Sequence, residues 1–297
     1  MVQERNDRIG HFLLVIVVLT WGANFGIVKS AYAYIPPLLF GAIRFTITGI
    51  LLLCVTFWQE KGIWLRKEDL GKIVLIGGMG LGLYQVLWSI GLNLTSPSNS
   101  ALILSTQPLL GLLYIDLFKE EPVGRHEYVG MLVALVGVAF VMLKPTSELH
   151  FSMETLPGDL LTLVAGFCSA IFFSVWSKPL LERYSPLRLM SYCMIVGSLV
   201  LWIASPFSSQ PFVWSQLWTS TWWSMGYAVL FSGMLGHVFW YEGLGRVGVT
   251  KSMVYLYFIP IWAVLFNTLM MGEKVFLQQI LGGVLILLGV HQTLKRS

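Results

Sequence analysis

The sequence consists largely of apolar stretches that run for about twenty residues without strand-like alternation, which is the length that a helix needs to cross a bilayer. Inside lipid every backbone N–H and C=O group must be paired within the protein, so only helices or closed barrels can span it. Barrel strands are about ten residues long and alternate in polarity. The chain is therefore predicted to be an all-α integral membrane protein.

The composition agrees with lipid as the surrounding solvent. Only 11% of the residues are charged and 56% are hydrophobic, whereas soluble domains carry about 25% charged residues. Cys54, Cys168 and Cys193 lie in apolar stretches and lack the spacing of metal ligands. We therefore expect no disulfide, no metal and no cofactor, and we attribute the net charge of +4 to membrane topology rather than to a nucleic-acid partner.

Ten membrane-spanning helices account for the apolar stretches and for the Pro-containing turns between them. Their expected ranges are 11–33, 37–57, 72–93, 98–118, 127–143, 158–178, 187–205, 221–244, 250–271 and 275–294. Of the 19 Lys and Arg residues, fifteen fall on one side of this topology, only Lys144 and Lys274 fall on the other, and Lys29 and Arg44 lie within helices. Because basic residues collect on the cytoplasmic side, we predict a multi-pass protein of the cytoplasmic membrane with both termini in the cytoplasm.

The sequence also repeats itself. Residues 83–138 align without a gap on residues 235–290, and sixteen of the 56 aligned pairs are identical, where about four are expected by chance. The first two helices of each half match weakly at an offset of 149 residues. Two five-helix repeats are therefore predicted, 1–145 and 146–297, and the second enters from the opposite side because five is odd. Inverted repeats that enclose a central cavity are typical of secondary transporters.

Two prolines occupy equivalent positions at the predicted centres of helices four and nine. Pro108 and Pro260 each remove a hydrogen bond to the carbonyl four residues earlier, which belongs to Leu104 or Leu256. A matched pair predicts kinks that act in gating. The alternative is that proline is simply common in membrane helices.

Polar and aromatic side chains on the predicted helices are the candidates for substrate binding. Helix three offers Gln85 one turn from Trp88, and the same offset gives His237 and Trp240 in helix eight. The full set of candidates is Trp21, Asn24, Tyr84, Gln85, Trp88, Gln107, Trp176, His237, Trp240, Tyr241 and Tyr255. The tryptophans have interfacial anchoring as an alternative role, and the amides of Asn24 and Gln107 have hydrogen bonding between helices.

Two charged residues are candidates for binding a carboxylate or for coupling. Arg44 lies about two turns inside the second helix, where it is either a structural arginine or the cation for a substrate carboxylate. Glu242 lies four residues before Arg246, so the two are expected to form a local pair near the membrane surface, with a coupling role as the alternative. With so little charge at the centre, an amphipathic, zwitterionic or aromatic small molecule is the expected substrate.

These motifs resemble the EamA family of the drug/metabolite transporter superfamily over nearly the whole chain. The segments that carry the resemblance are Trp21-Gly22-x-Asn24-Phe25, Pro37 with Arg44-Phe45, Gly91 through Ser98, Ser100-Ala101, Pro108, Glu121, Gly130 and Gly137, together with their second copies. Pro97 and the pair Val247-Gly248 depart from the pattern. The resemblance implies ten helices, inverted repeats, cytoplasmic termini and a central cavity formed by helices one, three, four, six, eight and nine.

The resemblance also implies export of metabolites, often amino acids, or of toxic compounds. The sequence therefore predicts a secondary transporter that works by alternating access, with a small-molecule substrate and the bilayer as its partners and no prediction of oligomeric state. A regulatory or scaffold subunit without transport is the main alternative. A membrane enzyme is less favoured, because the sequence has no HExxH or GxSxG motif and no carboxylate pair at helical spacing in a predicted span.

Overall fold

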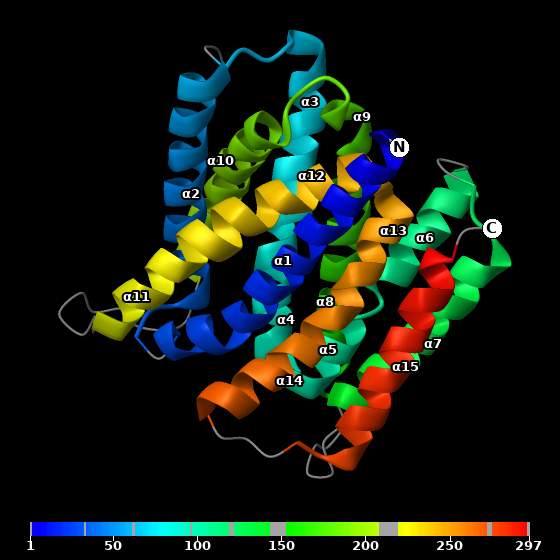
Figure 1. Cartoon of the computed structure of the whole chain (residues 1–297). Helices are drawn as coiled ribbons and strands as arrows, with labels where there is room; N and C mark the ends of the chain where they lie inside the picture. Colours follow the sequence, from blue (N-terminus) through cyan, green and yellow to red (C-terminus); the bar gives the residue numbers. More distant parts are fainter. Residues whose placement is uncertain are drawn as a thin grey trace.

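The computed structural model describes residues 2–32, 34–60, 63–95, 97–118, 122–142, 153–207, 219–271 and 275–295. All regular secondary structure within these ranges is helical (Figure 1). The first half contains α1 (Val2–Ala31), α2 (Pro37–Glu60), α3 (Lys67–Leu75), η1 (Ile76–Leu83), α4 (Tyr84–Leu94), α5 (Pro97–Leu104), α6 (Gln107–Phe118) and α7 (Arg125–Met142). The second half contains α8 (Leu156–Cys168), η2 (Ser169–Val175), α9 (Lys178–Leu181), α10 (Pro186–Ala204), η3 (Ser205–Phe207), α11 (Thr219–Tyr227), η5 (Ala228–Gly236), α12 (His237–Val247), α13 (Val249–Met253), η6 (Val254–Tyr257), α14 (Phe258–Met271) and α15 (Leu277–Leu294).

Eight helical segments of the described chain are long and apolar enough to cross a membrane, which confirms an all-helical multi-pass membrane protein. The predicted helices one and eight correspond to α1 and to the uninterrupted segment α11–η5–α12. The first helix begins at Val2 rather than at residue 11. Its polar start is held by a hydrogen bond that the Arg246 guanidinium in α12 donates to the Asn6 side chain. The predicted boundary between the repeats, at residues 145 and 146, lies outside the described residues.

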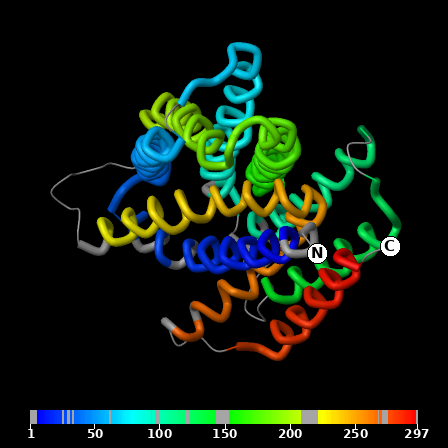
Figure 2. The backbone as a smooth tube through the Cα atoms, turned by 45° about the horizontal axis from the view of Figure 1, so that its top comes forward, coloured from blue at the N-terminus to red at the C-terminus, as the bar shows by residue number. Residues whose placement is uncertain are grey.

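Helix pairing follows the internal repeat. In the first half α4 packs against α8, and the equivalent partners in the second half, α12 and α1, pack against each other (Figure 2). In the same way α5 and α6 contact α8 and η2, while α14 contacts α1. The helices α2 and α10 pair with each other, as do α7 and α15. Each half therefore makes the same set of contacts with the other, as expected for two inverted five-helix repeats.

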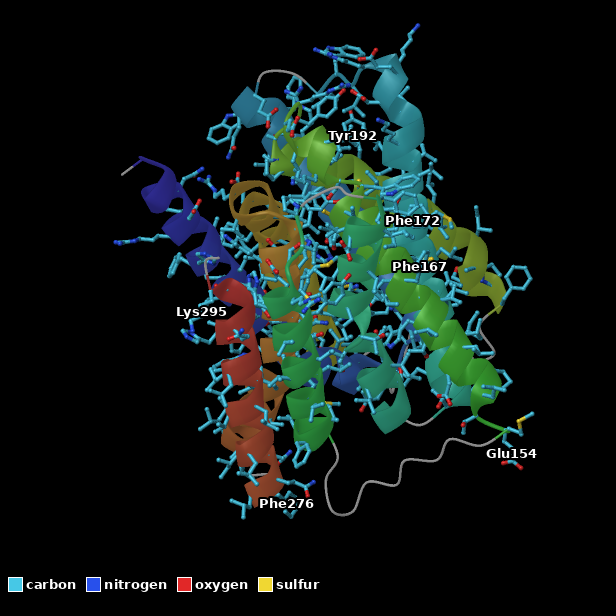
Figure 3. The ribbon with its side chains drawn as sticks, turned by 90° about the vertical axis from the view of Figure 1, so that its right-hand side faces the viewer. Glu154, Phe167, Phe172, Tyr192, Phe276 and Lys295 are labelled. Carbon is cyan, nitrogen blue, oxygen red and sulfur yellow. The ribbon has the colours of Figure 1, made fainter. Side chains whose placement is uncertain are left out.

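The crossing of α7 and α15 shows the equivalence of the two halves at the level of single residues. A Cβ atom added to Gly130 would lie 2.6 Å from the Gly289 carbonyl oxygen, and one added to Gly137 would lie 2.7 Å from that of Gly282. At the repeat offset of 152 residues Gly130 is equivalent to Gly282 and Gly137 to Gly289, so the two contacts are equivalent. Figure 3 shows α15, between Phe276 and Lys295, running alongside α7. Glycine is needed at these four positions because the two backbones touch.

Three of the helices contain a π-helical segment that the sequence did not predict. Two of them, η1 and η5, occupy equivalent positions in the two repeats, and the third, η2, lies in the sixth predicted helix. Close contacts accompany them, since a Cβ atom on Gly80 would lie 2.7 Å from the Phe173 backbone nitrogen. π-Helical turns widen the backbone spiral and are frequent at functional sites. Here η1 and η2 pack against each other, whereas η5 packs against α1 and α2.

The backbone is interrupted just before both of the paired prolines. The helix α5 ends at Leu104 and α6 begins at Gln107, so that Pro108 follows the break directly. In the second half the 3₁₀ segment η6 precedes α14, and Pro260 is the third residue of that helix. Both interruptions fall where a proline removes the hydrogen bond to the carbonyl four residues earlier.

Candidate functional site

A group of aromatic rings occupies the junction of the two repeats. The Trp21 ring lies 5.0 Å from the His237 ring and 5.6 Å from the Trp240 ring, measured between centroids. Phe173 contacts His237 edge-on at 5.8 Å and stacks on Tyr241 at 5.0 Å. These five residues, which come from α1, η2 and α12, are called the aromatic cluster below.

The π-helical segment η5 supplies polar backbone atoms to this cluster. The Ser232 carbonyl lies 2.8 Å from His237 Nδ1 and also accepts the indole N–H of Trp21 at 3.2 Å. The Gly233 carbonyl lies 3.1 Å from the same imidazole nitrogen. Because both neighbours of Nδ1 are acceptors, the proton is assigned to Nδ1, which leaves Nε2 of His237 as an acceptor for a further group.

Several buried polar atoms around the cluster have no hydrogen-bond partner among the described residues. They are Oδ1 of Asn24, Nε of Arg44 and Nε1 of Trp240. Buried polar groups are almost always paired in folded proteins, and an unpaired one inside a membrane is especially costly. Such atoms beside an aromatic cluster are suited to bind the polar groups of a small molecule.

The candidates from the third and fourth predicted helices have neighbours within the first half of the chain or in α8. Gln85 donates to the Ser89 hydroxyl at 3.3 Å, and Trp88 donates to the Ser100 hydroxyl at 3.2 Å. Tyr84 begins α4, and Gln107 begins α6 with its side chain against Gly166 of α8. Gln85 and Trp88 therefore already have hydrogen-bond partners, unlike the indole N–H of Trp240.

Arg44 is a buried charged residue of α2, the helix that packs against η5. It is 8% exposed, and its guanidinium lies 4.8 Å from the centroid of the adjacent Phe45 ring. Its charge acts on Tyr32, Tyr84 and His237. Within the described part of the chain no carboxylate forms an ion pair with it.

Three other predicted site residues have local partners away from the aromatic cluster. Trp176 donates to the Tyr114 hydroxyl at 2.8 Å, and the Tyr255 hydroxyl lies 2.8 Å from His11 Nδ1. Glu242 pairs with Arg246 at 2.8 Å. The structure therefore brings together Trp21, His237, Trp240 and Tyr241, with Asn24 one helical turn from Trp21, and does not bring these three to the same place.

A surface groove of about 210 Å³ opens sideways between α1 and α14. Only apolar surface lines it, and the residues that form it are Val15, Val18, Leu19, Tyr255, Phe258, Ile261, Trp262 and Leu265. It faces the surroundings of the bundle rather than the aromatic cluster, so it is not the predicted central cavity. No cluster of His, Cys, Asp or Glu suited to a metal ion occurs in the described ranges.

The sequence did not single out Phe173 or the two carbonyls of η5. Phe173 is the counterpart of Asn24 at the offset of 149 residues, so extending the repeat to the first two helices would have found it. No sequence signal marks the Ser232 and Gly233 carbonyls, because their availability depends on the π-helical turn. Phe25 was also part of the predicted first-helix motif, and its side chain lies outside the described residues.

Comparison with known proteins yields one family for both halves. The sequence pattern of the EamA-like transporter family matches residues 8–143 and again residues 156–294. The two matches together cover most of the chain and agree with its two repeats.

Individual relatives are similar over nearly their whole length. A protein from Bacillus subtilis described as an uncharacterized transporter, YyaM, is 27% identical over 91% of this chain and 88% of its own. An uncharacterized transporter from Archaeoglobus fulgidus is 25% identical over 96% of this chain and 98% of its own. One crystal structure superposes with a TM-score of 0.83 over 96% of both chains at 18% identity, which shows a shared fold.

Proposed function

Because the chain belongs to the EamA-like transporter family, a group of transporters and not of enzymes, we propose that it is a secondary transporter that exports small amphipathic metabolites or drugs, amino acids among them. The observation that supports this most is the aromatic cluster with its unpaired polar atoms, placed where the two inverted repeats meet. Rings accept an apolar or cationic part of a substrate, and the spare donors and acceptors take its polar groups.

Alternating access is the mechanism that we propose for this site. Inverted repeats can exchange conformations and thereby open one site to opposite sides of the membrane in turn. The interrupted helices before Pro108 and Pro260 lie at equivalent positions of the two repeats and are the proposed hinges. The repeats themselves are proposed to divide near residues 145 and 146.

The distribution of basic residues supports placement in the cytoplasmic membrane with both termini in the cytoplasm. On the same basic face, loops of the two halves are cross-linked: Asp69 accepts hydrogen bonds from Arg183 at 3.0 Å and from Tyr184 at 2.8 Å, and Arg188 pairs with Glu60 at 2.5 Å. Burial raises the pKa of the Tyr184 hydroxyl, so this residue stays protonated and keeps donating. We propose that these links hold the α2–α3 and α9–α10 loops together while other helices move.

Flux through liposomes that contain the purified protein tests the proposal. Saturable flux is expected for amino acids or related amines. The variant Trp240→Ala should change which members of the panel are carried, whereas Trp64→Ala, which alters an exposed ring in the loop before α3, should leave the pattern unchanged. Absence of flux for every member of a broad panel would contradict transport and favour a regulatory subunit.

A further inference from the structure

We infer that Arg44 binds the carboxylate of the transported molecule, so that the substrates are carboxylates of amino-acid type rather than neutral or purely cationic drugs. This inference rests on the proposed transport function and narrows its substrate class. The argument comes from the burial of Arg44, from the groups around it and from its counterpart in the second repeat.

Arg44 lies deep within the membrane-spanning part of α2, and the surrounding helices shield it from its surroundings. It lies seven residues after the first residue of α2, a rise of about 10 Å into the span, and only 8% of the residue is exposed. Arginine keeps its charge in proteins. A buried cation without a partner is strongly unfavourable, and charged residues inside membranes therefore mark ligand or ion sites.

The neighbours on which the charge of Arg44 acts are neutral or aromatic. The guanidinium lies over the ring of Phe45 on the same helix. Its charge also acts on Tyr32, just after α1, on Tyr84 in α4 and on His237 in α12. These groups lower the cost of the charge without cancelling it, and Nε of Arg44 has no hydrogen-bond partner.

The acidic residues that might have paired with Arg44 are used elsewhere. Asp69 binds Arg183, Glu60 binds Arg188 and Glu242 binds Arg246. These three pairs lie with the basic residues of the loops and helix ends, on the face opposite to the start of α2. The buried Asp159, in the first turn of α8, accepts hydrogen bonds from Thr95 and Thr155. The compensating negative charge for Arg44 is therefore expected from the substrate.

The second repeat shows that this position needs no cation for packing. At the offset of 149 residues the counterpart of Arg44 is Cys193 in α10, which is fully buried and neutral. Since α2 and α10 hold equivalent places and pack against each other, a structural requirement would apply to both. The charge in one repeat only is explained by a ligand that is itself asymmetric.

The groups beside Arg44 complement the rest of an amino acid. Thr48, one turn after Arg44 on α2, packs against Gly233, whose carbonyl lies 3.1 Å from His237 Nδ1, so α2 places the cation beside the aromatic cluster. The amide oxygen of Asn24, buried and unpaired, accepts from an ammonium group, and the faces of Trp21 and Trp240 attract a cation or an apolar side chain. A carboxylate at Arg44 with an ammonium group towards Asn24 uses both spare polar groups.

Matched ligand pairs test the inference directly on the wild-type protein. The panel contains amino acids and, for each, the amine that lacks only the carboxylate, such as phenylalanine with phenethylamine. Thermal shift in detergent should show stabilisation by amino acids and none by the paired amines. Equal binding of both members of the pairs would overturn the inference.

Substitution of the anchor supplies the second arm. The variant Arg44→Gln should weaken amino-acid binding by about 10- to 100-fold, the range for a charge-assisted hydrogen bond, while Arg44→Lys should retain part of the affinity because it keeps the charge but not the paired donors. The exposed Arg125→Gln at the start of α7 is the control and should change nothing. Unchanged affinity in folded Arg44→Gln would overturn the inference, and if that variant does not fold, Arg44→Lys and the ligand pairs decide.

Flux in liposomes separates this inference from the proposed function. Transport of amino acids but not of their paired amines supports both. Transport of the amines alone leaves the transport function standing and removes Arg44 as the carboxylate anchor. No transport of any member contradicts the proposed function itself.

Discussion

The two repeats meet in two regions, and only one of those regions keeps their equivalence. At the crossing of α7 and α15, Gly130 meets Gly289 and Gly137 meets Gly282, each pair being the image of the other. The start of both helices is also matched, because Glu127 accepts the Gly124 N–H at 2.7 Å and Gln279 accepts the Phe276 N–H at 3.0 Å.

At the centre the same offset relates residues that behave differently. Trp88 donates to Ser100, but its counterpart Trp240 has no partner, and Ser252 donates instead to the Gly248 carbonyl at 2.8 Å. Gln85 reaches Ser89, four residues along its own helix, whereas His237 bonds to the carbonyls of η5. Symmetry is thus retained where packing holds the fold and is lost at the proposed binding site.

The largest expected effect breaks the symmetric region. In Gly282→Val the added atoms must displace the Gly137 carbonyl, which lies only 2.6 Å from an added Cβ atom, and we expect the free energy of unfolding to fall by about 3 kcal/mol. The neighbouring Gly283 has nothing within 4 Å of an added Cβ atom, so Gly283→Ala should be neutral or stabilising by up to about 1 kcal/mol. Denaturant unfolding in detergent measures both, and equal losses would show that the crossing is not a backbone contact.

The next effect compares the polar partners of the two central helices. His237→Phe removes the imidazole donor from the Ser232 and Gly233 carbonyls, of which only Ser232 keeps the Trp21 N–H, and should lower the free energy of unfolding by about 2 kcal/mol. Gln85→Leu removes a single bond to Ser89 and should cost about 1 kcal/mol or less. The same unfolding measurement checks the order, and a larger loss for Gln85→Leu would contradict the stronger anchoring of His237.

A smaller effect is expected at the two equivalent tryptophans, in substrate affinity for Trp240 and in the free energy of unfolding for Trp88. Trp240→Phe keeps the ring and removes the unpaired N–H, so substrate affinity should fall by about fivefold, which corresponds to one hydrogen bond of about 1 kcal/mol. Trp88→Phe breaks only the bond to Ser100, so it should lower the free energy of unfolding by about 1 kcal/mol and leave affinity unchanged. Titration of a bound amino acid, together with unfolding, measures both quantities, and identical behaviour of the two variants would remove the asymmetry.

The smallest change in stability is expected at the paired prolines. Pro108→Ala or Pro260→Ala restores a backbone donor and should raise the free energy of unfolding by at most about 1 kcal/mol, while flux at equal protein amount should fall because the proposed hinge stiffens. Both variants should behave alike if the repeats exchange conformations. Unchanged flux in both would mean that the interruptions play no part in gating.

Much of this arrangement was accessible from the sequence. The apolar stretches predicted the helices, and the offset of 152 residues paired Gln85 with His237 and Trp88 with Trp240. The π-helical turns were not predictable in this way, because they depend on contacts such as that of Gly80 with the Phe173 backbone. The sequence also could not predict which of the two tryptophans has an unpaired N–H. Ser100 and Ser252 are the same residue type, but Ser100 accepts from Trp88 whereas Ser252 donates to the Gly248 carbonyl.

The inverted arrangement of the repeats supports everything proposed for the centre, and cysteine labelling in intact cells tests it most directly. Val123 and Val275 are equivalent residues just before α7 and α15. With the three native cysteines replaced, Val123→Cys and Val275→Cys should react with a membrane-impermeant reagent from opposite sides. Labelling of both from the same side would contradict the inverted repeat and alternating access with it.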